Sequence, residues 1–122
     1  MKEDDATLQK IETIIQNRKR ARAFYMERSD VYRAFTEMDQ KTYRDGALAK
    51  VQKELIAVGI SVTKNCESCM EWHISQALDG GATPEQIIEA VGVGMEMSGG
   101  PGTVYARFAM AALEYHLERR MK

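Results

Sequence analysis

Three residues in the segment KNCESCMEWH could do redox chemistry together. Cys66 and Cys69 form a C-x2-C motif and His73 follows four residues later. With Asn65 as the expected helix cap and Cys66 as the first helical residue, a rotation of about 100° per residue places all three side chains on one narrow stripe. A thiol at a helix start has a lowered pKa, from about 8.5 to about 7 here, because the helix dipole stabilises an anion. A dithiol able to open and close a disulfide is therefore predicted, with His73 as a proton carrier.

Two other interpretations of the cysteines are weighed against this one. A C-x2-C motif can be half of a zinc site, but four ligands are then needed, and His73 and His116 are the only histidines of the chain. His116 is expected near the C-terminal end of the last helix, among exposed charges. Both cysteines could also be buried and inert. The redox dithiol is favoured over each, and no metal site or cofactor is predicted.

Glu54 is the candidate acid of the same site. It precedes a nearly continuous apolar stretch, LIAVGISV, so we expect its carboxylate to be desolvated and its pKa to be raised towards that of a general base. An ordinary helix-start acid is the alternative. Glu54 lies twelve residues before Cys66, which gives the full pattern E-x11-C-x2-C-x3-H.

The elements that must position these side chains are helices. The chain has 122 residues, enough for one domain, and its apolar periodicity is helical throughout, so an all-α fold of about six helices is predicted. Asp5–Ser29 forms a long first helix, and Ser29 and Asp30 cap a second. Interior glycines at Gly92 and Gly94 suggest close approach of a neighbouring helix. The helix ranges are expected at about 5–29, 30–44, 47–65, 66–78, 84–98 and 103–119, with Thr83, Pro84 and Gln86 starting the fifth and a break over 98–102.

Composition excludes several classes of protein. The formal net charge of −1 offers no field for nucleic acid or acidic lipid, and the basic run RKRAR at residues 18–22 is interpreted as a solvated helix face or a subunit contact. The longest apolar run is too short to span a bilayer, and the acidic N-terminus is unlike a secretory signal. We therefore expect a cytoplasmic protein, in which paired cysteines serve redox or metal chemistry rather than a structural disulfide.

The pattern E-x11-C-x2-C-x3-H resembles the core motif of the alkylhydroperoxidase D-like family, within the carboxymuconolactone decarboxylase superfamily. The similarity continues through LDGGATPEQIIEAVGVG and YARFAMAALE, so residues 46–122 are expected to form the family core and residues 1–45 a helical extension. The resemblance implies a thiol-dependent peroxidase, with Cys66 and Cys69 as the reactive thiols and Glu54 and His73 as a proton-relay pair. It also implies a homotrimer or homohexamer that uses a dithiol, thioredoxin-type or lipoyl-type electron donor.

Two details leave the function open within this class. In the family the second cysteine generally attacks peroxide, whereas the helix dipole favours Cys66, so the attacking residue is not assigned. Well-known members have a histidine just before the second cysteine, where this chain has Ser68. Serine does not titrate near neutral pH, so a protein disulfide reductase is a second option. A redox-sensing or metal-binding helical oligomer without turnover is the non-enzymatic alternative.

Overall fold

A computed structural model describes residues 4–121 of the chain. These residues form six helices, α1 (Asp5–Arg28), α2 (Asp30–Tyr43), α3 (Lys50–Thr63), α4 (Glu67–Asp79), α5 (Pro84–Ser98) and α6 (Gly100–Arg120). The described residues contain no strand, which confirms the all-α prediction. No helix among them is both long enough and apolar enough to cross a membrane.

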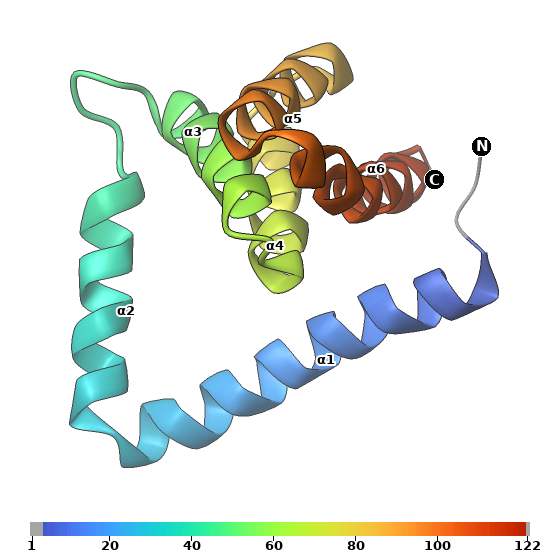
Figure 1. Ribbon diagram of the computed structural model, residues 1–122. Coiled ribbons are helices and arrows are strands. Elements are labelled where there is room, and N and C mark those ends of the chain that lie inside the picture. The colour runs from blue at the N-terminus through green and yellow to red at the C-terminus, as the bar shows by residue number, and fades with distance from the viewer. Residues whose placement is uncertain (1–3, 122) are drawn as a thin grey trace.

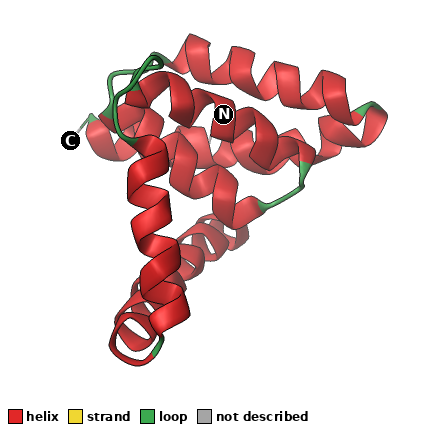
Figure 2. Cartoon of the chain, turned by 90° about the vertical axis from the view of Figure 1, so that its left-hand side faces the viewer, coloured by secondary structure: helices red, strands yellow, loops and turns green. Residues whose placement is uncertain are grey.

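Helices α3 to α6 pack into a bundle, and α1 and α2 form an arm beside it (Figure 1). Helix α3 packs mainly on α4 and α5, and α6 closes the bundle against α5 and α4. Helix α1 runs beneath the bundle in Figure 1. The corner between α1 and α2 projects away from the bundle (Figure 2). The arm thus leaves much of its own surface uncovered.

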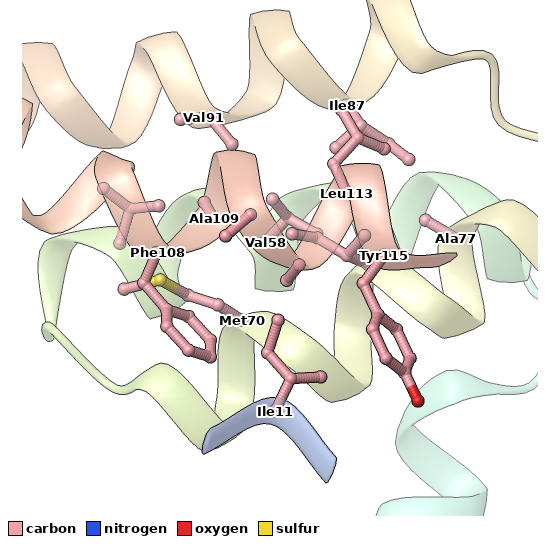
Figure 3. Close-up of a cluster of buried hydrophobic side chains, with 14 of the residues drawn as sticks. Ile11, Val58, Met70, Ala77, Ile87, Val91, Phe108, Ala109, Leu113 and Tyr115 are labelled. Carbon is pink, nitrogen blue, oxygen red and sulfur yellow. The ribbon is translucent and has the colours of Figure 1, made fainter. Parts of the chain in front are cut away.

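One hydrophobic core joins the bundle to α1. Figure 3 shows Ile11 of α1 inserted towards Met70 of α4 and Phe108 and Tyr115 of α6. Ile11 and Met70 are fully buried. Burying one such side chain stabilises the fold by about 1.5–3 kcal/mol, so Ile11 fastens the N-terminal half of α1 to the bundle. Helix α2 has no comparable anchor, because none of its residues is buried.

A glycine in α5 explains why this helix can lie so close to α3. A Cβ at Gly94 would overlap the backbone of Gly59 and the side chain of Val62 on α3, so the predicted packing reason is confirmed there. Gly92 faces open space, and for this residue the same expectation was wrong. The predicted break over 98–102 is shorter than expected. Only Gly99 leaves helical geometry, with φ 74°, and α6 already begins at Gly100.

Candidate active site

The start of α4 differs from the expectation in one residue. Cys66 itself is the N-cap, and Asn65 is the preceding residue with a left-handed backbone, φ 51°. The Sγ of Cys66 accepts the backbone N–H of Cys69 at 3.2 Å. Cys66 therefore occupies the capping position usually held by an oxygen side chain, where free N–H groups and the helix dipole favour a thiolate.

The two sulfurs are joined in a disulfide, and both cysteines are partly exposed. Their Cα atoms are 5.2 Å apart, within the range usual for disulfides. Oxidant or reductant can therefore reach this pair from solvent. The alternative in which both cysteines are buried is therefore wrong.

Glu54 and His73 are brought together across the α3–α4 interface. His73 Nδ1 lies 2.7 Å from Oε1 of Glu54, and Glu54 is almost completely buried at 2% exposed. An ionised carboxylate can only accept, so Nδ1 carries the proton, and no side chain among residues 4–121 forms a hydrogen bond with Nε2. Cys69 and His73 are four residues apart on α4 and so lie on the same side of that helix.

The expected rise in the pKa of Glu54 is wrong. Burial alone raises this pKa, but hydrogen bonds from His73 and Lys50, together with their charges, outweigh burial and hold the pKa below its usual value. Lys50 Nζ lies 2.7 Å from Glu54 Oε2, and it also reaches Gln76 Oε1 at 3.4 Å. Glu54 is thus a permanent anion at neutral pH that orients and polarises His73, rather than a base poised near pH 7.

A cavity of about 390 Å³ opens beside this acid–imidazole pair. Its lining includes Glu54 and Lys50 from α3, Trp72 and Gln76 from α4, and Tyr43 from the end of α2. The ring of Tyr43 lies 5.2 Å from the imidazole of His73, centroid to centroid. Burial, then the negative charges of Glu54 and Asp39, raise the pKa of Tyr43. The sequence pattern did not indicate Tyr43, Lys50 or Gln76 as site residues.

A second buried carboxylate–imidazole pair lies elsewhere on α4. Glu71, 1% exposed, approaches His116 of α6 with Oε2 2.7 Å from Nε2, and Arg18 of α1 forms an ion pair with Glu71 Oε1 at 2.5 Å. His116 Nδ1 faces the guanidinium of Arg120 at 3.1 Å. Because arginine can only donate, Nδ1 accepts, and His116 is the neutral tautomer protonated on Nε2.

This second pair corrects the expectation that His116 is exposed. His116 is buried, and its ring nitrogens are engaged by Glu71 and Arg120. The guanidinium of Arg18, from the RKRAR segment, also lies 4.8 Å from the ring of Trp72. Among residues 4–121, no group of three or more histidine, cysteine, aspartate or glutamate side chains is placed to hold a metal ion. His116 is thus engaged away from the cysteines and does not complete a zinc site with them.

The fold and this arrangement define a class: small all-helical proteins that carry a cysteine pair at the start of one helix and a glutamate–histidine pair beside it. The model of the carboxymuconolactone decarboxylase family matches residues 29–112, so the chain belongs to that family, and its alkylhydroperoxidase D-like resemblance is confirmed. The matched range takes in α2 as well as α3, α4 and α5.

Two uncharacterized proteins are similar to this chain in sequence. An uncharacterized protein of Cupriavidus necator is 45% identical over 78 residues, which cover 64% of this chain and 69% of that protein. An uncharacterized protein from the cox locus of Paracoccus denitrificans is 41% identical over 81 residues, covering 66% and 73%.

Solved structures agree with the fold. A carboxymuconolactone decarboxylase family protein of Legionella pneumophila superposes with a TM-score of 0.80 at 32% identity, over 88% of this chain and 96% of that one. A family member from Thermotoga maritima, described as a candidate for involvement in an antioxidative response, superposes with a TM-score of 0.82 over 89% and 93%. At 24% identity this second likeness concerns the fold alone.

Proposed function

We propose that the protein is a thiol-dependent peroxidase that cycles Cys66 and Cys69 between dithiol and disulfide, with Glu54 and His73 as its proton relay. The observation that supports this most is the 2.7 Å contact between the buried Glu54 carboxylate and Nδ1 of His73, on the helix that begins at the cysteine pair. A protein that only senses redox state through two thiols has no need of such a pair.

The proposed reaction has two steps on the enzyme. Nε2 of His73 takes the proton of one thiol, the resulting thiolate attacks a peroxide oxygen, the O–O bond breaks, and the departing alkoxide takes that proton back from Nε2. This leaves an alcohol and a cysteine sulfenic acid. The second thiol then attacks the sulfenic sulfur, a disulfide forms, and water leaves. The two thiols have supplied the two electrons that reduce the peroxide.

The cycle needs an external dithiol to restore the thiols. The dithiol attacks the disulfide through a mixed disulfide and is itself oxidised in a second exchange. We propose a thioredoxin-type or lipoyl-type donor, and a cytoplasmic setting in which such dithiols are kept reduced. Both cysteines are partly exposed, as exchange with an external dithiol requires.

The experiment that tests the function follows thiols and peroxide in one sample. Fully reduced protein is mixed with hydrogen peroxide or an alkyl hydroperoxide without reductant. The remaining thiols and the remaining peroxide are then titrated in the same sample. We expect one peroxide consumed for two thiols lost, and continuous consumption once a dithiol is supplied. Disulfide formation without any peroxide consumption, or no turnover with any dithiol, would reject the peroxidase.

A protein disulfide reductase is the second candidate function, favoured by Ser68. This residue is exposed between the cysteines and cannot supply a titrating proton near neutral pH. Reduction of a disulfide-bonded protein substrate needs the same dithiol but no relay to a peroxide oxygen. Reduction of such a substrate in the absence of peroxide turnover would favour this function over the first.

Replacing Glu54 by glutamine should lower peroxide turnover by about 10²–10⁴-fold, the usual contribution of acid–base catalysis. The amide keeps the shape but loses the charge that orients His73. Since the pKa of Glu54 is lowered, the wild-type rate should show no inflection from this carboxyl between pH 5 and pH 8. Steady-state kinetics across this range check both points, with the exposed α5 residue Glu89, changed to glutamine, as the control.

We further propose that the chain forms a homotrimer or homohexamer through the outer face of α3 and α5. Ile56, Ile60, Val93 and Met97 are each at least half exposed there, around an apolar groove of about 460 Å³. Exposed apolar patches of this kind mark contact surfaces. Light scattering at micromolar concentration should give three or six chains, and Val93→Asp should dissociate them. A wild-type monomer would contradict the proposal.

A further inference from the structure

The end of α2 is fixed to the start of α3 by the loop between them. Lys53 Nζ donates to the backbone carbonyl of Arg44 at 2.8 Å, and the Lys50 backbone N–H donates to Asp45 Oδ1 at 2.7 Å. Both contacts lie next to Tyr43, the last residue of α2. Most of α2 is exposed, but Tyr43 is partly buried against the bundle.

The ring of Tyr43 lies against the His73 imidazole in a tilted contact. The centroids are 5.2 Å apart and the planes are tilted by 34°, a geometry of ordinary aromatic contact. One edge of the imidazole is already fixed, because Nδ1 is held by Glu54 at 2.7 Å. The hydrogen bond at Nδ1 alone would leave the imidazole of His73 free to rotate about that bond. The neighbouring ring of Tyr43 restricts this rotation.

The hydroxyl of Tyr43 is poorly suited to acid–base work. Its surroundings raise the pKa of Tyr43, so the group stays neutral at physiological pH. No hydrogen bond from this hydroxyl is among the contacts of the described residues. The contact between the rings is therefore the feature of Tyr43 through which it can act on the site.

We propose that Tyr43 is a positioning residue of the candidate site, whose ring keeps the His73 imidazole in the orientation that joins Nδ1 to Glu54 and leaves Nε2 for the thiol chemistry. This inference rests on the proposed function of Glu54 and His73. It assigns to the N-terminal part of the chain a direct role in the site, since Tyr43 comes from α2 and not from the helices that carry the cysteines.

The test compares Tyr43→Leu with Tyr43→Phe by two readouts. The first is NMR of the imidazoles, which is simple because the chain has two histidines and His116 serves as an internal reference. Tyr43→Leu should remove the ring-current shift of His73 and weaken its preference for the Nδ1–H tautomer, without moving the His116 signals. Tyr43→Phe should restore the wild-type signals of His73.

The second readout is peroxide kinetics. Misplacing a catalytic group by about 1 Å can cost 10²-fold, so Tyr43→Leu should lower kcat by about 10- to 100-fold with little change in KM, and Tyr43→Phe should recover most of the loss. Tyr25→Leu, the same exchange at the exposed corner of the arm, should change neither readout. Thermal unfolding shows that each variant is folded.

Each outcome decides the proposal. An unchanged His73 spectrum in Tyr43→Leu overturns it, and so does a Tyr43→Phe variant as impaired as Tyr43→Leu, which would mean that the hydroxyl acts. If wild-type protein shows no peroxide turnover, the proposed function fails, but the NMR comparison still shows whether Tyr43 positions His73.

Discussion

Replacing either Cys66 or Cys69 by serine is expected to reduce peroxide turnover to the background of the uncatalysed reaction. The proposed cycle needs one sulfur to attack and the other to close the disulfide, and a serine hydroxyl can do neither at neutral pH. Continuous peroxide consumption with a dithiol donor measures this effect. Turnover in both variants equal to that of the wild type would show that the cysteines do not carry the reaction.

The same two variants identify the attacking cysteine. In a single-turnover experiment without donor, the variant that retains the attacking sulfur should still consume one peroxide and accumulate a sulfenic acid, and the other should consume none. The chain has only these two cysteines, so a thiol count is read without interference. The N-cap position of Cys66 and its N–H contact from Cys69 favour Cys66 as the lower-pKa thiol.

Replacing Glu71 by alanine should destabilise the fold by about 3–5 kcal/mol, the usual cost of leaving a buried charge without its partner. Arg18 would lose the carboxylate with which it pairs at 2.5 Å, and His116 would lose its acceptor at 2.7 Å. Because these partners lie on α1 and α6, the loss affects the packing of both helices on α4. Denaturant unfolding of the wild type and the variant measures the difference.

Glu37→Ala is the matched control. Glu37 pairs with Lys41 within α2, and both side chains are largely exposed. Exposed pairs contribute about 0–1 kcal/mol, so this variant should unfold nearly as the wild type does. An equal cost for Glu71→Ala and Glu37→Ala would contradict the structural role of the Glu71 pair.

The pH dependence of stability is a second test of the role of Glu71. Burial raises the pKa of Glu71, but His116 and Arg18 outweigh it and hold the pKa below the ordinary value of 4.5. The stabilisation from this group is therefore complete above about pH 4.5 and is lost as pH falls through the lower folded-state pKa. Glu71→Gln should remove this part of the acid sensitivity, and unfolding curves between pH 7 and pH 3 test it.

Much of the candidate site could be predicted from local pattern. On a helix, residues three or four apart share one side, so the spacing alone places Cys69 and His73 together, with Cys66 at the N-cap just before them. The capping box at Thr83 could also be predicted, because all its atoms come from neighbouring residues. In the structure Gln86 donates its backbone N–H to the Thr83 hydroxyl at 3.1 Å. Glu54 was found through its spacing within the motif, not through any property of its own.

Most of the contacts that were not predicted join residues far apart in the sequence. Glu71 lies inside the motif, but its partners Arg18 and His116 are far from it in sequence, and only the packing of α1 and α6 on α4 brings them together. The pKa of Glu54 was predicted in the wrong direction because burial was inferred from the apolar sequence, while the hydrogen bonds from His73 and from Lys50, four residues earlier on α3, were left out of account. Tyr43 reaches His73 only through the course of the loop after α2.

The four residues of the proposed chemistry all come from one helical hairpin. Glu54 lies on α3, and Cys66, Cys69 and His73 lie at or in the start of α4, with a short connection between the two helices. Distances within the reactive set are thus governed by one local packing interface. Apart from Tyr43 on α2, helices elsewhere in the chain can accumulate substitutions that alter assembly or donor preference without retuning the reacting atoms, which makes this hairpin, with Tyr43 beside it, the natural unit to graft onto another helical scaffold.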